Sequence, residues 1–270
     1  MKKVDMHMHT VASDGTWDAA ELKKELKKNK IDIFSLTDHD SVENIKNMLD
    51  ILESRDNLIF IPGTELSTEY EGKEYHLTLY GFDINNFSLL ELMNRTNQNK
   101  LSSNLDYIKY AANKYDNVSV EDFERYDNDR KRGGWKSANY MIDKRIHKDI
   151  PEHIKDVYDS GLKAELKGPE EVINIAKKSG GKVFLAHPSY HYKNTAMPME
   201  ELKYWLELGI EGIECFSPYN GDRAEYYINF CKKNNLMISG GSDCHGTFIP
   251  SRILGVPNVT LDELDIKKLL

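Results

Sequence analysis

The sequence predicts an α/β fold built on a mostly parallel sheet, with a helical segment inserted between its two halves. Short apolar runs alternate with helical periodicity in the first 95 residues and again from about residue 166 onward. Residues 96–165 break this alternation, because they are polar and helical in pattern. Ligand-type side chains stand at the ends of several apolar runs. If the sheet closes into a barrel, these ends are gathered on one face.

The N-terminal part reads strand, helix, strand, helix and then two strands. A strand is expected at about 3–8 and a helix at about 17–29, where Asp18 is a candidate N-cap. The strand IDIFSLT then precedes a helix around 41–54. The runs LIFIPGTELST and KEYHLTLYGF flank the polar turn EYEGKE, a pattern typical of a hairpin.

The C-terminal third resumes the alternation. A helix at about 169–179 ends at Gly180 and Gly181, and the strand KVFLAH follows it. Two further helices are expected at 199–208 and 221–234, followed by the apolar runs GIEGIECF and LMISGGS. Three strands separated by helices again favour a parallel sheet.

The middle segment is expected to fold and not to act as a linker. Regularly spaced apolar residues occur in LSSNLDYIKYAANKY, SANYMIDKRI and IPEHIKDVYDSG. The densest basic stretch of the chain, RYDNDRKRGGWKSANYMIDKR, lies here as well. We therefore divide the chain into a barrel, residues 1–95 and 166–270, and a helical cap, residues 96–165, folded over the barrel mouth.

Composition narrows the class of protein. A chain of 270 residues is long enough for one large α/β domain, and 40% hydrophobic with 30% charged residues is an ordinary balance for a folded protein. No apolar run approaches the ~20 residues of a membrane span. The start MKKVDMHMH lacks the apolar core of a signal peptide, so a cytoplasmic protein is expected.

Charge and cysteine usage add two further limits. The net charge of −8 argues against broad binding to duplex nucleic acid, although a metal-filled pocket still attracts phosphate or a short single-stranded end. Cys215, Cys231 and Cys244 show no CxxC spacing and are expected to be small buried residues in a reducing compartment.

The motif MHMHTVASD places His7, His9 and Asp14 at the end of the first apolar run. Side chains at i and i+2 of a strand point the same way, so the two imidazoles present neighbouring nitrogen ligands. The carboxylate follows in the loop. Metal sites that activate water are built from such ligands, and the motif therefore predicts the start of a metal centre.

Later segments end their apolar runs with the same kinds of side chain. The candidates are Asp38 and His39 in IDIFSLTDHD, Glu65 in LIFIPGTELS, His76 in KEYHLTLYGF, His187 in KVFLAHPS, and Asp243 and His245 in LMISGGSDCHG. A single histidine at a strand end is more often structural than a ligand, but convergence of so many segments favours a metal cluster. His147, His153 and His191 lie in polar surroundings and are expected to be less constrained.

The segments DMHMHTVASDGTWDAAEL, FSLTDHDSVE, PGTELST and SGGSDCHG resemble the motifs of the PHP (polymerase and histidinol phosphatase) family of metal-dependent phosphoesterases. The resemblance covers essentially the whole chain in the order and spacing of its motifs. It implies a distorted (β/α)7 barrel with a metal centre at the barrel mouth. It also implies a phosphoric ester hydrolase in which a hydroxide bridging the ions attacks phosphorus.

The resemblance implies up to three divalent ions, and Mn, Fe and Zn all suit imidazole and carboxylate ligands. The implied ligands are, ion by ion, His7, His9, Glu65 and Asp243; Glu65 again with His76 and His187; and Asp14, His39 and His245. The residues implied to act in catalysis are His9, His39, Glu65, His187 and Asp243. Asp38, beside His39, is expected to orient an imidazole.

Within the family, the chain resembles stand-alone members of similar length. These include phosphatases of nucleoside 3′,5′-bisphosphates and 5′–3′ exoribonucleases for short oligonucleotides, and the similarity runs along GIECFSPYNGDRAEYYINFCKKNNLMISGGSDCHG. The resemblance therefore implies a phosphomonoester, or a terminal phosphodiester, of a small nucleotide-like substrate. Histidinol phosphate phosphatase and a non-catalytic metal-binding module are the alternatives.

Two positions depart from the bisphosphatase branch, in which two arginines bind the second phosphate of the substrate. The insertion motif GGWKSANYMID carries Trp135 at the first arginine position, and SYHY follows AHP where the second is usual. We expect Arg252, or else Arg132 and Lys136, to replace these arginines. The aromatic residues that are candidates for stacking on a nucleobase, with a packing role as the alternative, are Trp135, Tyr190, Tyr192 and Tyr219.

Overall fold

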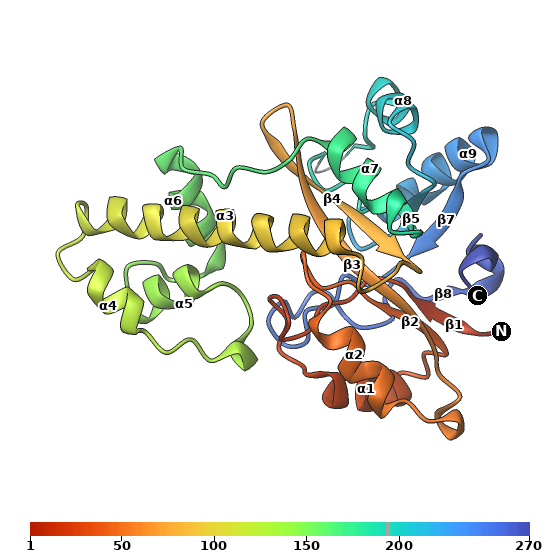
Figure 1. The fold of residues 1–270 in the computed structure, drawn as a ribbon, viewed down its shortest axis with the longest axis horizontal. Helices are drawn as coiled ribbons and strands as arrows, with labels where there is room; N and C mark the ends of the chain where they lie inside the picture. Colours follow the sequence, from red (N-terminus) through yellow and green to blue (C-terminus); the bar gives the residue numbers. More distant parts are fainter. Residues whose placement is uncertain (193–194) are drawn as a thin grey trace.

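The computed structural model describes residues 1–192 and 195–270, and its strands form one sheet that curls into a nearly closed barrel (Figure 1). The strands are β1 (Lys3–Asp5), β2 (Ile33–Leu36), β3 (Ile59–Tyr70), β4 (Lys73–Tyr80), β5 (Lys182–Leu185), β6 (Gly212–Phe216), β7 (Met237–Gly240) and β8 (Val259–Thr260). Their order in the sheet, β7-β6-β5-β4-β3-β2-β1-β8, follows the chain from β1 to β7.

The barrel closes where the segments that follow β1 and β7 run side by side. The amide of Asp243 donates to the carbonyl of His7 at 2.8 Å, and a parallel bridge joins Met8 to Cys244. The short strand β8 pairs antiparallel with β1 outside this ring. Seven strands in chain order therefore surround the core, which confirms the expected distorted (β/α)7 barrel.

The hairpin of β3 and β4 interrupts the parallel order. The two strands pair antiparallel from Gly63 opposite Tyr80 to Tyr70 opposite Lys73, and β4 pairs antiparallel with β5 as well. The remaining pairs among β1–β7 are parallel. Gly72 takes a φ of +76° in the connecting turn, where a residue without Cβ is favoured. The predicted hairpin is confirmed.

Helices cover the outside of the barrel. They are α1 (Ala19–Lys28), α2 (Glu43–Ile51), α7 (Pro169–Lys178), α8 (Met199–Glu207) and α9 (Ala224–Asn234). The predicted N-cap of the first helix is present, because the Asp18 carboxylate accepts from the Glu21 amide at 2.9 Å and Glu21 accepts from the Asp18 amide at 3.0 Å. This helix buries Leu22 and Leu26 against the barrel. Cys215, Cys231 and Cys244 are buried and unpaired, as expected.

The segment between β4 and β5 forms a helical unit, which we define as α3 to α6. Its helices are α3 (Phe87–Ala112), α4 (Val120–Arg125), α5 (Lys136–Asp143) and α6 (Ile150–Ser160). α3 runs outward from the barrel and the other three pack around its far half (Figure 1). Tyr107, Ile108, Phe123, Tyr140 and Met141 belong to a core of its own. Because α3 begins nearer the barrel than residue 96, the division of the chain at 96 and 165 stays a prediction.

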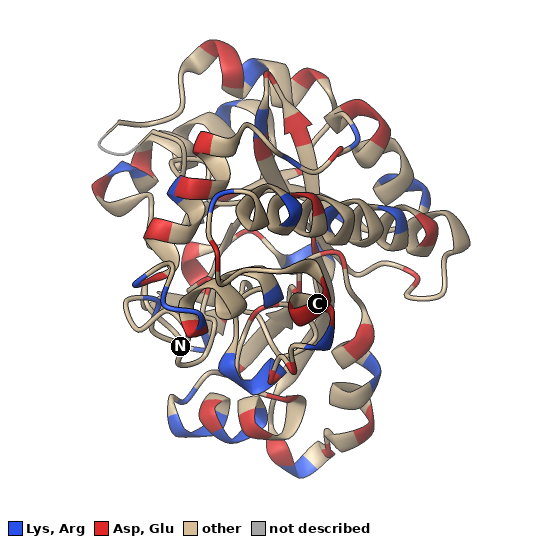
Figure 2. Ribbon diagram, turned by 90° about the vertical axis from the view of Figure 1, so that its left-hand side faces the viewer, with Lys and Arg blue, Asp and Glu red and all other residues tan. Residues whose placement is uncertain are grey.

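The basic stretch of the helical unit is paired with acidic groups. Arg130 lies 3.1 Å from Glu43 of α2, and Lys131 lies 3.1 Å from the Asp18 carboxylate. Figure 2 shows Lys and Arg mixed with Asp and Glu on the helices around the barrel.

Across the part of the chain that the structure describes, no helix is long and apolar enough to cross a membrane.

Two histidines of the helical unit correct an expectation. His147 is 4% exposed and His153 is 3% exposed, whereas polar surroundings in the sequence had indicated little constraint. The prediction was wrong because their polar neighbours in the chain face outward, while the two rings pack inward and lie 5.3 Å apart. His191 is half-buried at the barrel mouth, where its Nε2 contacts the Glu74 carbonyl at 2.7 Å.

Candidate metal centre

The barrel mouth collects ligand-type side chains from the ends of the strands. His7 and His9 follow β1, and the bridge at Met8 keeps this segment strand-like, so that both rings point into the mouth. Both are fully buried, and their Nε2 atoms lie 3.3 Å apart. The arrangement expected from their spacing is therefore present.

Glu65, from the middle of β3, lies at the centre of the cluster and is fully buried. The distances from its Oε2 are 3.3 Å to His7 Nε2, 3.2 Å to His9 Nε2 and 3.2 Å to His39 Nδ1, and those from its Oε1 are 2.9 Å to His187 Nε2 and 3.2 Å to His76 Nδ1. One carboxylate thus contacts five imidazoles that come from four different segments of the chain.

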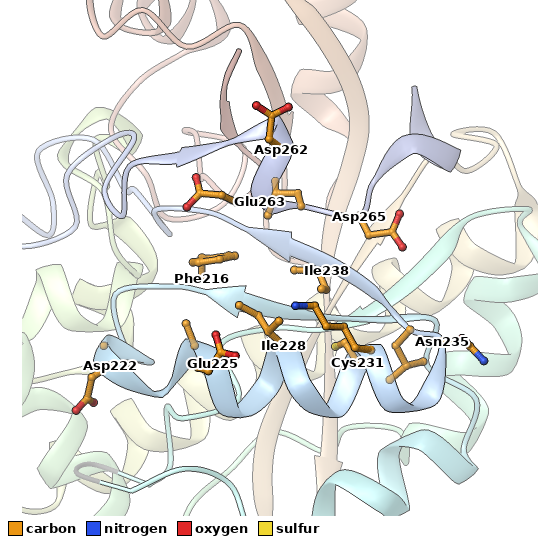
Figure 3. A pocket seen from close by; sticks show the side chains of 15 residues that line it. Phe216, Asp222, Glu225, Ile228, Cys231, Asn235, Ile238, Asp262, Glu263 and Asp265 are labelled. Atoms are coloured by element: carbon orange, nitrogen blue, oxygen red, sulfur yellow. The ribbon is translucent and has the colours of Figure 1, made fainter. Parts of the chain in front are cut away.

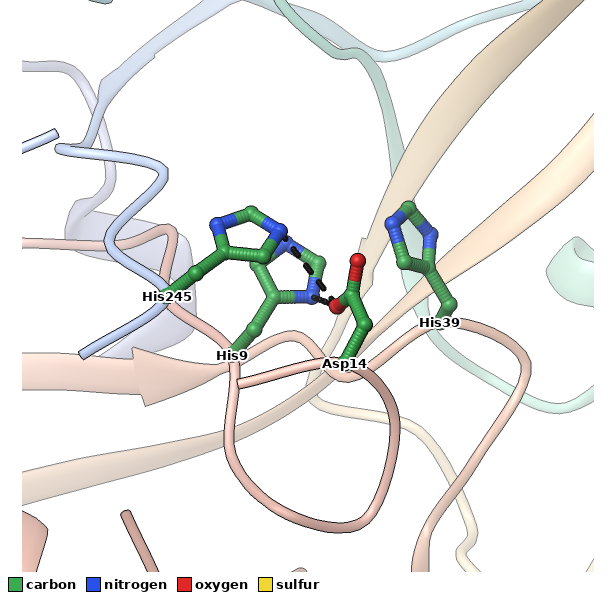
Figure 4. Close-up of side chains that lie close together, drawn as sticks. All are labelled: His9, Asp14, His39 and His245. Atoms are coloured by element: carbon green, nitrogen blue, oxygen red, sulfur yellow. Dashed lines mark ion pairs between the residues drawn. The ribbon is translucent and has the colours of Figure 1, made fainter. Parts of the chain in front are cut away.

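Two further carboxylates complete the cluster on the side of His245. The Asp14 Oδ1 lies 3.5 Å from His9 Nδ1 and 3.3 Å from His245 Nε2. Figure 4 marks both ion pairs with dashed lines. The Asp243 Oδ1 lies 3.1 Å from His9 Nε2 and 3.5 Å from His7 Nε2. Asp243 takes a left-handed φ of +51°, a strained backbone conformation of the kind that occurs at functional sites.

Three overlapping groups place one ligand atom of each member within 4.8 Å of the others. The groups are His7, His9, Glu65 and Asp243; His9, Asp14, His39 and His245; and His39, Glu65 and His76. Through its contact with Glu65, His187 joins the same cluster. All nine predicted ligands are therefore together. Their allocation to individual ions stays a prediction, because two of the groups share His39 and two share His9.

Unpaired atoms inside the cluster test whether cations fit it. Asp14 Oδ1, His39 Nδ1 and Glu65 Oε2 are buried and have no hydrogen-bond partner among the described residues. Burying an unpaired carboxylate oxygen costs free energy, and a cation at that point offsets the cost. The donors are imidazole nitrogens and carboxylate oxygens without thiolate. These residues fit divalent metal ions.

The charges in the cluster oppose the effect of burial on the pKa values of its carboxyl groups and imidazoles. Burial raises the pKa of Glu65, but the charges of His7 and His76 hold that pKa well below its usual range. Burial lowers the pKa of His9, yet the neighbouring carboxylates of Asp243 and Glu65 raise it to about 9. Without ions, shared protons therefore hold these groups together, and cations compete with those protons for the same atoms.

Neighbouring groups determine which ring nitrogen faces the cluster. Glu214 is fully buried and its Oε1 lies 3.0 Å from His7 Nδ1, while its Oε2 accepts from the His187 amide at 2.6 Å. An ionised carboxylate can only accept, so His7 Nδ1 donates, and in the neutral ring Nε2 is the nitrogen that carries the lone pair toward the cluster. Sequence reasoning missed Glu214. Its signal was an acidic residue inside the apolar run GIECF.

Asp38 holds the loop that carries Asp14. Its Oδ1 accepts from the Thr10 amide at 2.7 Å and the Ser13 hydroxyl at 2.6 Å, and its Oδ2 accepts from the Thr10 hydroxyl at 2.7 Å. Among its described hydrogen bonds there is none to an imidazole, and its expected role in orienting a ring stays a prediction. Asp38 holds the turn that presents Asp14, and Ser13 Oγ lies 3.4 Å from His9 Nδ1.

Two of the predicted substrate-binding residues lie beside the ligands. The Arg252 Nη1 is 2.9 Å from Asp243 Oδ2, and its guanidinium carbon is 5.1 Å from the centre of the Tyr219 ring. The Tyr190 ring is half exposed and lies 5.2 Å from Tyr219 and 5.5 Å from His187. These residues form a small cationic and aromatic rim around one side of the cluster.

The other predicted contacts lie in or near the helical unit. Arg132 Nη1 is 2.7 Å from the Asp143 carboxylate, and Lys136 donates to the Glu124 carbonyl at 3.2 Å. None of the contacts described for these two cations reaches a ligand, and their role in substrate binding stays a prediction. Trp135 is closer to the mouth, because its ring centre lies 6.4 Å from that of Phe248, on the loop after His245.

A groove of about 800 Å³ is lined by none of the predicted ligands, and Figure 3 shows the side chains that line it. It runs between α9 and the segment 262–265, and Phe216, Ile228 and Ile238 are among the apolar residues that line it. The barrel mouth, and not this groove, is the candidate site of chemistry.

No protein-family model matches the chain. Among curated proteins, it is 25% identical over 257 residues to a 5′-3′ exoribonuclease of Haemophilus influenzae, with 90% of each chain covered. It is 24% identical over 262 residues to the 5′-3′ exoribonuclease Rnm of Escherichia coli, covering 89% of this chain and 84% of that protein.

Solved structures share the fold. A Bifidobacterium adolescentis protein assigned to the metal-dependent phosphoesterases superposes with a TM-score of 0.79 at 20% identity, covering 98% of this chain and 93% of that one. A Chromobacterium violaceum amidohydrolase with bound sulfate gives 0.75 at 18% identity, covering 90% and 87%. The curated relatives are 5′-3′ exoribonucleases and the solved structures share the barrel, in agreement with the resemblance of the sequence motifs to the PHP family.

Proposed function

We propose that this cluster hydrolyses a phosphomonoester, or a terminal phosphodiester, of a small nucleotide-like substrate. The observation that carries the proposal is the convergence of nine ligand-type side chains around the unpaired oxygens of Asp14 and Glu65. The exoribonuclease relatives support a nucleotide or a short RNA end as the substrate. The cytoplasmic location expected from the sequence stays a prediction.

We propose up to three divalent ions, Mn, Fe or Zn, held by these nine side chains. When bound, such ions lower the pKa of water and neutralise phosphoryl oxygens as negative charge builds in the transition state. The protein holds its ligands ready for this. Glu214 turns His7 Nε2 inward, and the Asp243 carbonyl accepts from His245 Nδ1 at 2.7 Å and so turns His245 Nε2 toward Asp14.

Arg252 is the residue that we propose binds the phosphate. The Asp243 carboxylate and the Tyr219 ring hold its guanidinium beside the ligands, which reduces the conformational entropy lost when a phosphate binds. Its planar fork suits two phosphate oxygens at once. Tyr190 offers a half-exposed ring next to it for a base or sugar. Arg132, Lys136 and Trp135 remain further candidates.

Release of inorganic phosphate by Mn²⁺-reconstituted protein tests the proposal. The panel contains adenosine 3′,5′-bisphosphate, AMP, histidinol phosphate, a short 5′-phosphorylated RNA and p-nitrophenyl phosphate. We expect a preference for the bisphosphate or the RNA. A preference for histidinol phosphate would assign the alternative activity, and an inert panel with metal bound would favour a non-catalytic module.

The Arg252→Gln variant sharpens this test. It is expected to raise KM for the preferred nucleotide at least about tenfold, because a charge-assisted pair of hydrogen bonds is lost. Arg55→Gln is the matched control, since Arg55 is exposed and pairs only with Glu53 among the described residues. An unchanged KM in Arg252→Gln would move the phosphate contact to another cation.

A further inference from the structure

Lys100 of α3 reaches from the helical unit to the barrel mouth, where it contacts two carboxylates. Its Nζ lies 3.2 Å from Asp40 Oδ2 and 3.1 Å from Glu74 Oε1, and donates to the Ser67 hydroxyl at 2.6 Å. Its side chain is 27% exposed, and that of Asp40 is 1% exposed. An ammonium has three donors, and here three acceptors surround it. Lys100 is therefore held in one place, unlike a solvated surface lysine.

One of the two carboxylates, that of Glu74, determines the protonation pattern of a predicted ligand. Glu74 lies two residues before His76 on β4, hence on the same face of the strand, and its Oε1 is 3.3 Å from His76 Nε2. Since an ionised carboxylate only accepts, His76 Nε2 donates to it, and in the neutral ring Nδ1 carries the lone pair. That Nδ1 faces Glu65 at 3.2 Å. Glu74 thus selects the tautomer in which His76 can bind a cation together with Glu65.

The second carboxylate fixes the backbone next to another predicted ligand. Asp40 follows His39 and takes a left-handed φ of +44°. It accepts from the Ser67 amide at 3.1 Å and the Ser67 hydroxyl at 2.8 Å. Its carbonyl accepts from the side chain of Asn97 at 2.8 Å, one turn before Lys100 on α3. The helix therefore holds the segment that carries His39 at two points.

We infer that Lys100 is a positioning residue for the metal-binding group of His39, Glu65 and His76. The inference rests on the proposed function, in which this group holds a cation. Lys100 acts through Glu74 and Asp40, and no contact between Lys100 and the three ligands themselves is found among the described residues. Through this lysine, the helical unit becomes part of the support of the metal centre.

Removing the lysine has two opposite consequences that an experiment can separate. Without it, two carboxylates lose their shared cation, one of them buried, so Glu74 and Asp40 no longer hold their histidines in place. The loss of a positive charge near the mouth also favours cations in general, by an amount that salt screens. Misplaced ligands weaken the binding of one ion, whereas the loss of the positive charge strengthens the binding of every ion.

The test is a Co²⁺ titration of the metal-depleted full chain, followed by the visible absorption of the ion and checked by metal analysis. The variants are Lys100→Met, Lys100→Arg as the conservative rescue, and Lys109→Met as the matched control. Lys109 lies on the same helix, is exposed and pairs with Asp106 at 2.8 Å, so its loss removes the same charge away from the ligands.

We expect Lys100→Met to bind one equivalent at least about tenfold more weakly, with altered absorption for that step only. Lys100→Arg is expected to restore the step, and Lys109→Met to match the wild type. Glu74→Ala should weaken the same step by about 10- to 100-fold. Its side chain is 43% exposed, so this second variant carries the test if Lys100→Met does not fold.

Unchanged or tighter binding of every equivalent by folded Lys100→Met, or by Glu74→Ala, overturns the inference. Failure of the proposed function has a different signature. Suppose that the wild type binds cobalt, that the Lys100 variant loses one binding step, and that neither protein hydrolyses a phosphoester. The positioning role then stands, and the enzymatic proposal falls.

Discussion

The barrel mouth and the helical unit both bury histidines, but they surround them differently. At the mouth, six imidazoles lie around the carboxylates of Asp14, Glu65 and Asp243. In the helical unit, His147 and His153 face each other with their Nδ1 atoms 3.2 Å apart. Among the described residues, one carboxylate, that of Asp156, lies near them, 3.4 Å from His147 Nε2.

The two surroundings shift the pKa values of the buried imidazoles in opposite directions. Burial lowers the pKa of His9, but its carboxylate neighbours raise it to about 9. For His153, burial together with the charge of His147 lowers the pKa to about 4, and Asp156 opposes the shift only in part. Burial by itself therefore does not mark a ligand site. The number of carboxylates within reach of the ring does.

The largest effect is expected from breaking the ligand cluster. Asp243→Ala or His39→Ala should lower kcat at least about 10³-fold and reduce bound metal, because each removes a ligand that no neighbour replaces. His153→Asn in the helical unit should leave metal content unchanged. Steady-state kinetics and metal analysis after metal-depleted preparation check this. Unaltered turnover by either ligand variant would sink the assignment of the cluster.

The next largest effect is the pH dependence of metal binding. His9 and His76, with pKa values raised to about 9 and about 10, hold protons at pH 7 in the metal-free protein, and a ligand nitrogen must lose its proton to bind an ion. Metal affinity should therefore rise up to about tenfold per pH unit for each such group until its pKa is passed. Calorimetry in buffers of different ionisation enthalpy measures the release. Binding with no release would contradict the raised values.

The same shift has a consequence for stability without metal. A raised pKa in the folded state means that the charged form of His9 stabilises the fold fully below its unfolded value of about 6.5. This contribution is lost as the pH rises through about 9. Metal should accordingly protect the fold most at alkaline pH, which thermal unfolding with and without Mn²⁺ can follow.

The smallest effect belongs to the helical unit. Because the pKa of His153 is lowered, its neutral form stabilises the fold fully above about 6.5, and this stability is lost as the pH falls to about 4. His153→Asn keeps a polar partner for His147. It should reduce the loss of unfolding free energy over this pH range by about 2 kcal/mol. Urea unfolding followed by circular dichroism between these pH values compares the two proteins. Parallel curves would show that other groups cause the acid loss.

Local patterns determined much of the barrel and of its ligand set. The alternation of apolar runs and helices, the polar turn between β3 and β4, and the cap at Asp18 each depend on neighbours within a few residues. The i and i+2 spacing of His7 and His9 is of the same kind. Such features are governed by backbone periodicity, which a sequence displays directly.

Contacts between distant segments were decided only by the tertiary structure. Glu214 is 207 positions from His7, and no spacing announces that its carboxylate sets the tautomer of that ring. Lys100 lies in a polar helical stretch of the sequence, yet it is partly buried between the carboxylates of Asp40, in the loop after β2, and Glu74, on β4. The sequence by itself determined which chemical groups are available. Closure of the barrel determined which of them meet, because that depends on packing across the whole chain.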